Sequence, residues 1–121
     1  MAKVLLVEDD KFLVRVFEVK LKKEGFQTLL MENGVGVEEA VKKEKPDVIV
    51  LDLVMPARDG FETLNGLKAD SQTKNVPVIV VTALNSPEDR KICLDAGAKE
   101  YLVKDAVTME EIVGVIRKYA R

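Results

Sequence analysis

Five short apolar segments, separated by stretches with helical periodicity, dominate this sequence and limit the folds open to it. The segments are Val4–Val7, Phe26–Met31, Val48–Leu53, Val76–Val81 and Tyr101–Val103. Their length and their content of Val, Ile and Leu are typical of β-strands. The third and fourth segments lack polar alternation, which is expected of strands covered by helices on both faces. We therefore predict that these two strands lie at the centre of a sheet.

Between the predicted strands, apolar residues recur every three or four positions, which is the period of a helix with one buried face. The clearest rows are Leu13, Val16, Phe17 and Leu21, and Met109, Ile112, Val113 and Ile116. Strands that alternate with helices in this way form an open parallel sheet with helices on both sides. The prediction is a flavodoxin-like α/β fold, a three-layer α/β/α, doubly wound, five-stranded parallel sheet with strand order 2-1-3-4-5.

Short-range signals predict where several helices begin and end. Residues with the spacing of N-terminal caps are Asp59 with Glu62, Ser86 with Pro87, and Thr108 with Glu111. Asp10 fits the N-cap of the first helix, and Gly25 and Gly97 are placed to end helices. These signals agree with the helical periods, so the two kinds of pattern predict the same elements.

Length and composition indicate a single domain over residues 1–121 with one hydrophobic core. The 19 basic residues nearly balance the 21 acidic ones and are spread along the chain, so direct nucleic-acid binding is not expected. No segment approaches the roughly 20 apolar residues that cross a bilayer, and the first residues do not resemble a signal peptide. We expect a cytoplasmic protein without a membrane anchor.

The chain contains no histidine and one cysteine, so the usual ligands of transition metals are missing. Oxygen ligands remain, and these favour hard cations such as Mg²⁺ or Ca²⁺. Acid–base chemistry by histidine is excluded as well. Cys93 lies between Ile92 and Leu94, and we predict that it packs in the interior without a chemical role.

Polar side chains follow the predicted strands at their carboxyl ends, where ligands bind in open α/β sheets. They are Glu8 and Asp9 after the first strand, Asp52 after the third, Thr82 after the fourth and Lys104 after the fifth. Three close carboxylates stay ionised only if a cation offsets them; otherwise one takes up a proton. Such a pocket repels the phosphates of flavins and dinucleotides. With Mg²⁺ and Lys104 in place it attracts a phosphoryl group, and Asp52 is then the candidate nucleophile.

The motifs around these positions form an ordered set along the whole chain. They are Val7-Glu8-Asp9-Asp10, Leu51-Asp52-Leu53-Val54-Met55-Pro56 with Asp59-Gly60, Val81-Thr82-Ala83, and Tyr101-Leu102-Val103-Lys104. This set resembles the receiver domain of bacterial two-component response regulators, the family of the chemotaxis protein CheY. The resemblance implies that Asp52 accepts a phosphoryl group from a phosphohistidine on a sensor histidine kinase or a histidine phosphotransfer protein.

The resemblance also implies roles for the other site residues. Mg²⁺ is expected to bind Glu8, Asp9, Asp52 and the backbone carbonyl of Val54. Lys104 is expected to contact the phosphoryl oxygens.

Two further residues resemble the switch of the family. Thr82 is expected to be the hydroxyl that moves toward the phosphoryl group, and Tyr101 the aromatic that swings inward. Their movement would reshape the surface of the fourth helix, fifth strand and fifth helix, where a downstream effector protein or domain binds.

The chain departs from the family pattern in three ways. Asp105 follows Lys104 where the family usually has proline, often after a cis peptide; a non-proline cis bond costs about 3–4 kcal/mol, so either a trans bond or a strained cis bond is expected. Glu8 replaces Asp and is expected to contact the metal through water. Val54 and Leu84 are apolar at the positions two past Asp52 and Thr82, so neither aligns a water, and we expect the acyl phosphate to be long-lived.

A second function remains open at this stage. Phosphatases of the haloacid-dehalogenase type also form an aspartyl phosphate, but they place a second acid two residues later, where this chain has Val54. We therefore expect a signalling domain that assists its own phosphotransfer and dephosphorylation, and not an enzyme that turns over external substrates. The sequence leaves open a stand-alone switch, a relay intermediate or one domain of a longer regulator.

Overall fold

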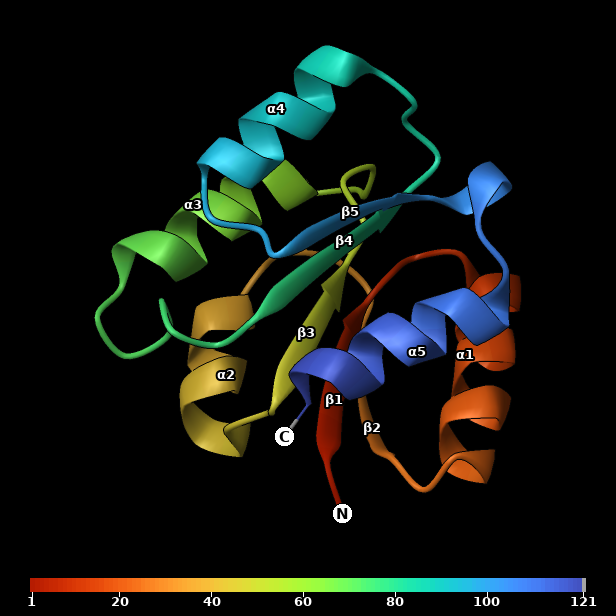
Figure 1. Ribbon diagram of the computed structural model, residues 1–121. Helices are drawn as coiled ribbons and strands as arrows, with labels where there is room; N and C mark the ends of the chain where they lie inside the picture. Colours follow the sequence, from red (N-terminus) through yellow and green to blue (C-terminus); the bar gives the residue numbers. More distant parts are fainter. Residues whose placement is uncertain (121) are drawn as a thin grey trace.

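The computed structural model describes residues 1–120 as alternating strands and helices (Figure 1). The strands are β1 (Lys3–Val7), β2 (Gln27–Met31), β3 (Val48–Leu51), β4 (Val78–Thr82) and β5 (Glu100–Val103). The helices are α1 (Lys11–Lys23), α2 (Val37–Glu44), α3 (Gly60–Ala69), α4 (Pro87–Asp95) and α5 (Met109–Tyr119), with a 3-10 turn η1 (Lys104–Ala106) before α5. The predicted number and order of elements are therefore confirmed for this part of the chain.

The strands form one parallel sheet in the order β2-β1-β3-β4-β5, as predicted. The order reverses between β1 and β3, which are direct neighbours. Leu51, the last residue of β3, lies opposite Val7 of β1 and Val80 of β4. Because these strands end at nearly the same level, the residues that follow them are brought to one edge of the sheet.

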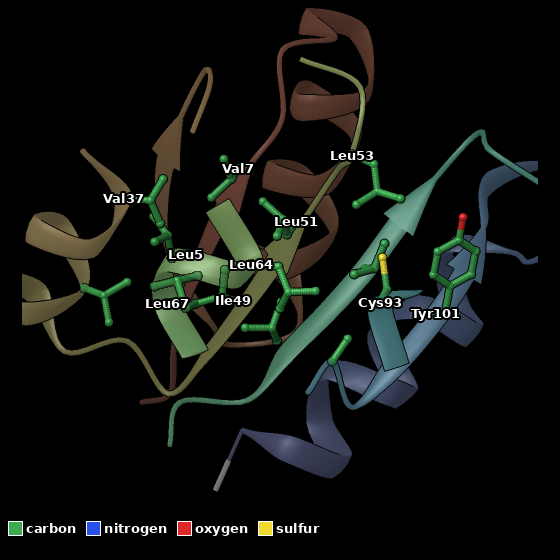
Figure 2. Packing of buried hydrophobic residues seen from close by; sticks show 14 residues of the cluster. Leu5, Val7, Val37, Ile49, Leu51, Leu53, Leu64, Leu67, Cys93 and Tyr101 are labelled. Atoms are coloured by element: carbon green, nitrogen blue, oxygen red, sulfur yellow. The ribbon is translucent and has the colours of Figure 1, made fainter. Parts of the chain in front are cut away.

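The sheet divides the apolar interior into two clusters, one on each face, where the sequence had suggested one core. Alternate strand residues point to opposite faces, so even the fully buried central strands contribute to both clusters. Helices α1 and α5 cover one face, and α2, α3 and α4 cover the other (Figure 1). Figure 2 shows the cluster that α2, α3 and α4 cover, in which Tyr101 of β5 lies beside Cys93 of α4.

The predicted helix ends are largely confirmed. The Asp10 carboxylate accepts hydrogen bonds from the N–H groups of Phe12 and Leu13, and Thr108 with Glu111 forms a reciprocal capping box. The side chains of Asp59 and Ser86 cap α3 and α4, each by one hydrogen bond from the backbone three residues later. Both predicted helix stops adopt the left-handed conformation that favours glycine, at Gly25 and Gly97.

Two details differ from the sequence prediction. In α1 the buried row is Val14, Phe17 and Leu21, while Val16 is 37% exposed, because a period of 3.6 carries Val16 away from the face that Phe17 presents to the sheet. The third strand ends at Leu51, so Asp52 begins the loop that follows it.

Cys93 is buried, and its burial raises the pKa of the thiol to about 11, which agrees with a packing role. Among residues 1–120, no helix is both long enough and apolar enough to cross a membrane.

Candidate functional site

The carboxylates that follow β1 and β3 meet at the point where the strand order reverses. Glu8, Asp9 and Asp52 each offer an oxygen within 4.8 Å of the others. Glu8 and Asp52 are buried, and Asp9 is exposed at the rim. The parallel register of β1 and β3 causes this convergence, because it places position 8 and position 52 one step beyond a paired row.

Lys104 reaches into the acidic cluster from the end of β5. Its Nζ lies 2.9 Å from Glu8 Oε1 and 3.0 Å from Asp52 Oδ2. Burial of the Lys104 ammonium lowers its pKa, but the hydrogen bonds and charges of the two carboxylates outweigh burial and leave the pKa above its ordinary value. The lysine therefore stays protonated and offsets part of the negative charge.

Glu8 is held by both of its carboxylate oxygens. Oε1 faces Lys104, and Oε2 accepts hydrogen bonds of 3.1 Å from the N–H groups of Asp9 and Asp10. Burial, with a smaller contribution from the charge of Asp52, raises the pKa of Glu8 to about 7 despite these partners. The cluster is thus short of positive charge when Lys104 is its only cation.

Asp52 is fixed by the backbone that follows it. Its Oδ1 accepts a 2.7 Å hydrogen bond from the Leu53 N–H and a 3.4 Å one from the Val54 N–H. Its side chain is 5% exposed, so only a small part of the carboxylate can be reached from solvent. The Asp52 carboxylate is therefore oriented before any reaction, which is the arrangement that a nucleophile needs.

The donor set fits Mg²⁺, which prefers a few carboxylate oxygens and keeps several waters. Asp9 and Asp52 supply carboxylate oxygens that lie within 4.8 Å of each other. Both oxygens of Glu8 already have partners, which agrees with a contact through water for this residue.

Thr82 and Tyr101 lie on the neighbouring strands, β4 and β5. Thr82 is fully buried, and its Oγ1 accepts a 3.3 Å hydrogen bond from the Leu84 N–H. The Tyr101 hydroxyl donates to the Leu84 carbonyl at 2.8 Å, and the residue is 3% exposed. Tyr101 is therefore in an inward orientation, and Leu84 connects it to Thr82.

The peptide bond between Lys104 and Asp105 is trans, since residues 1–120 contain no cis peptide. Lys104 begins the short turn η1, so the chain bends as soon as it leaves β5. The lysine reaches Asp52 in this arrangement without the proline that the family usually has at the next position.

Two features that hold the loop after Asp52 were not predicted from the sequence. A Cβ atom at Gly60 would lie 2.2 Å from the Asp52 carbonyl oxygen and 2.6 Å from Leu53 Cα, so only glycine lets α3 begin this close to the acidic residue. Arg58 forms a bidentate ion pair with Glu38 of α2. The pair Asp59-Gly60 was recognised in the sequence as a motif, but the close approach of Gly60 to the backbone of Asp52 and Leu53 was not.

Comparison with known proteins gives the family of this chain. A family model described as the response regulator receiver domain matches residues 4–117. The chain belongs to this family.

Individual relatives agree with this assignment. The protein PilH of Pseudomonas aeruginosa is 36% identical to the chain over 104 residues, which cover 86% of each sequence. The receiver domain of Francisella response regulator 1452 has a TM-score of 0.90 and 30% identity, covering 99% of this chain and 97% of that one. The receiver domain of the sensor histidine kinase PA1611 from Pseudomonas aeruginosa has a TM-score of 0.87 and 28% identity, covering 98% and 97%; its structure has a magnesium ion coordinated in the active-site cleft.

Replacing Gly60 by alanine tests the close contact behind Asp52. We expect Gly60→Ala to lower the free energy of unfolding by about 1–3 kcal/mol, the usual cost of overpacking, because the new Cβ displaces backbone and not a flexible side chain. Urea unfolding followed by circular dichroism measures the change. Gly114 of α5 is the matched control, since a Cβ there meets nothing within 4 Å and Gly114→Ala should stabilise the protein by about 0.5–1 kcal/mol. Equal stability of Gly60→Ala and wild type would contradict the steric argument.

Proposed function

We propose that this receiver domain is a phosphorylation switch that accepts a phosphoryl group on Asp52 from the phosphohistidine of a sensor histidine kinase or a histidine phosphotransfer protein. The observation that carries the proposal is the arrangement of Asp52, which is buried, oriented by two N–H groups and contacted by Lys104. A carboxylate needed only for helix capping or for a turn would not require a partly buried ammonium group beside it.

In the proposed reaction an Asp52 carboxylate oxygen attacks the phosphorus of the phosphohistidine. The new O–P bond forms as the P–N bond breaks, and the electron pair of the P–N bond stays with the imidazole nitrogen of the donor. Lys104 then contacts the phosphoryl oxygens, where its ammonium group stabilises the transferring charge. The N–H groups of Leu53 and Val54 keep the Asp52 carboxylate in one orientation throughout.

Mg²⁺ is the cofactor that we propose for this site, held by Asp9, Asp52 and the Val54 backbone carbonyl, with Glu8 in contact through water. When bound, the ion neutralises the carboxylates and binds phosphoryl oxygens. The magnesium ion in the cleft of the related PA1611 receiver domain supports this assignment, as does the close set of carboxylate oxygens in this chain.

The switch that we propose passes through Leu84. A phosphoryl group on Asp52 attracts the Thr82 hydroxyl, and as Thr82 moves, the Leu84 N–H loses its acceptor. Leu84 also holds the Tyr101 hydroxyl through its carbonyl oxygen, so a shift of its backbone disturbs Tyr101 as well. Arg90 of α4 donates to the Tyr101 carbonyl at 3.0 Å, which extends the connection to α4.

The surface of α4, β5 and α5 is the proposed binding site of the downstream effector. Ile92 and Leu94 expose 52% and 36% of their surface on α4, and Tyr119 of α5 donates a hydrogen bond to Glu100 of β5. A protein partner can contact these three elements together because hydrogen bonds join both α4 and α5 to β5. We propose no direct contact with nucleic acid or membrane, and a cytoplasmic location.

We propose that the chain assists its own phosphorylation and dephosphorylation but does not turn over external substrates. Phosphatases that use an aspartyl phosphate need a second acid two residues after the nucleophile, and Val54 at that position is 57% exposed and apolar.

Labelling with acetyl phosphate tests the nucleophile and the metal together. Wild type should gain one phosphoryl group in the presence of Mg²⁺ and none after EDTA treatment, whereas Asp52→Asn should stay unlabelled in both conditions. Intact-mass spectrometry measures the addition. Labelling of Asp52→Asn at the wild-type level would refute Asp52 as the acceptor, and equal labelling with and without Mg²⁺ would refute the metal requirement.

The lifetime of the phosphorylated protein is a separate prediction. Because Val54 and Leu84 cannot align a water for attack, we expect hydrolysis to be slow compared with that of fast-switching chemotaxis relatives. The decay is followed by intact mass after removal of acetyl phosphate. A half-life of seconds in the purified protein would show that some other group activates water.

The switch itself can be followed by amide NMR. We expect beryllium fluoride, added with Mg²⁺ as a mimic of the phosphoryl group, to shift the amides of Thr82, Leu84 and Tyr101 as well as those beside Asp52. Asp52→Asn is the control and should show none of these shifts. Changes limited to the immediate neighbours of Asp52 would contradict the proposed connection through Leu84.

A further inference from the structure

A cluster outside the acidic site joins the loop after Asp52 to the segment before α2. Arg58 Nη1 donates to the Gly34 carbonyl at 3.1 Å, and the two terminal nitrogens contact the Glu38 carboxylate at 2.5 and 2.8 Å. Nη2 also donates to the Glu62 carbonyl at 3.2 Å. The Gly34 N–H donates in return to the Arg58 carbonyl at 3.1 Å. Arg58 is therefore bound through both its side chain and its backbone.

The cluster occupies a tightly packed slot. A Cβ atom at Gly66 would lie 2.3 Å from both Arg58 Nη2 and Glu38 Oε2, and one at Gly34 would lie 2.0 Å from the Thr63 hydroxyl oxygen. The side chains of Arg58 and Glu38 are only 24% and 22% exposed. The hydrogen bond from Arg58 lowers the pKa of Glu38, so the pair stays ionised at neutral pH. Such a bidentate, partly buried pair is geometrically specific, unlike an ordinary surface ion pair.

The loop between β3 and α3 is held more firmly at its ends than at its tip. At one end Leu53 is buried and its carbonyl accepts the Gly60 N–H at 2.9 Å. At the tip, Val54 is 57% exposed, and Ala57 has a φ of 66°, a conformation that few residues other than glycine adopt. Met55 packs partly buried against the apolar cluster, but Val54, Pro56 and Ala57 are exposed, so the contacts of Arg58 add to what little burial holds this tip.

We propose that Arg58, held by Glu38, is a positioning residue that fixes the β3–α3 loop and thereby the backbone groups of Leu53 and Val54 at the phosphoacceptor site. Its contacts reach those groups through the loop and not through Asp52 itself. The inference rests on the proposed function in one respect, since the Val54 carbonyl is taken as a ligand of Mg²⁺.

A second ion pair of the same kind provides the control. Lys42 of α2 contacts Asp70 at the end of α3 at 2.7 Å, and the two side chains are 29% and 27% exposed. Both pairs thus join α2 to the α3 region with similar burial. Only the pair of Arg58 and Glu38 lies next to the loop that follows Asp52.

The test compares Arg58→Gln, Glu38→Gln and Lys42→Gln. Mg²⁺ is titrated into each protein and its dissociation constant is obtained from amide NMR shifts, while hydrogen exchange of the Leu53 and Val54 amides is measured without metal. We expect Arg58→Gln to weaken Mg²⁺ binding by roughly tenfold, as is typical when groups that support metal ligands are removed, and to speed exchange of both amides. Glu38→Gln should have a smaller effect in the same direction, because Arg58 keeps its bonds to Gly34 and Glu62. Lys42→Gln should leave the Mg²⁺ affinity and the two amides unchanged.

Two results would overturn the inference. One is an unchanged Mg²⁺ affinity and unchanged Leu53 exchange in Arg58→Gln, with only the melting temperature lowered. The other is an equal loss of affinity in Lys42→Gln, which would mean that any weakening of the contact between α2 and α3 is enough. If Arg58→Gln does not fold, Glu38→Gln decides the question by the same criteria. None of these measurements depends on phosphorylation, so a failure of Asp52 to accept phosphate is detected separately.

Discussion

The crowding of Glu8, Asp9 and Asp52 at one edge of the sheet is the constraint to which the rest of the structure responds. Like charges this close repel one another, and burial together with the charge of Asp52 raises the pKa of Glu8. Among residues 1–120, the ammonium group of Lys104 and several backbone N–H groups contact the cluster, and together they leave it negative. The remaining charge makes a divalent cation favourable, and a bound cation makes a phosphoryl group favourable in turn.

The fold can hold such a cluster because the strands beneath it are largely apolar and the central ones are buried. Strands β3 and β4 are buried along their full length, with helices on both faces, so their positions do not depend on the acidic residues. The repulsion at the edge is therefore opposed by two apolar clusters that hold β1 beside β3. Protein interiors of this kind are close-packed, which is why a carboxylate at the end of such a strand stays in place.

The fold and the central residues of the site could be predicted from the sequence because each depends on a regular pattern. Alternation of strands and helices determines the topology, and topology brings the ends of β1 and β3 together. The helix caps at Asp10 and Thr108 are local signals and were predicted for the same reason. Composition indicated a single core, but the separation of the interior into two clusters follows from the predicted three-layer fold, in which helices cover both faces of the sheet.

Contacts between distant segments could not be predicted from one sequence. Arg58 and Glu38 are 20 residues apart and look like ordinary surface charges until α2 and α3 are packed together. Gly60 forms part of a motif, but the structure shows why glycine is needed there: a Cβ atom would lie 2.2 Å from the Asp52 carbonyl oxygen. The conformation of the peptide bond before Asp105 could not be predicted either, because the chain lacks the usual proline. The structure shows a trans bond, with the chain turning into η1 directly after β5.

The proposed switch must disturb the hydrogen bonds at Leu84, and their cost can be compared with the free energy that couples two sites in a protein. Tyr101 is a buried residue whose hydroxyl has the Leu84 carbonyl as its partner, so losing that partner would cost on the order of 1–3 kcal/mol. Coupling free energies between sites in proteins are of the same size, about 1–3 kcal/mol. The Leu84 N–H is held less tightly, by a 3.3 Å bond to Thr82, so Thr82 can leave at low cost while Tyr101 cannot. In the proposed switch, a phosphoryl group that attracts Thr82 would act first on the weaker of the two bonds to Leu84. Tyr101 would then move with the Leu84 backbone, because its own hydrogen bond to Leu84 is more costly to lose.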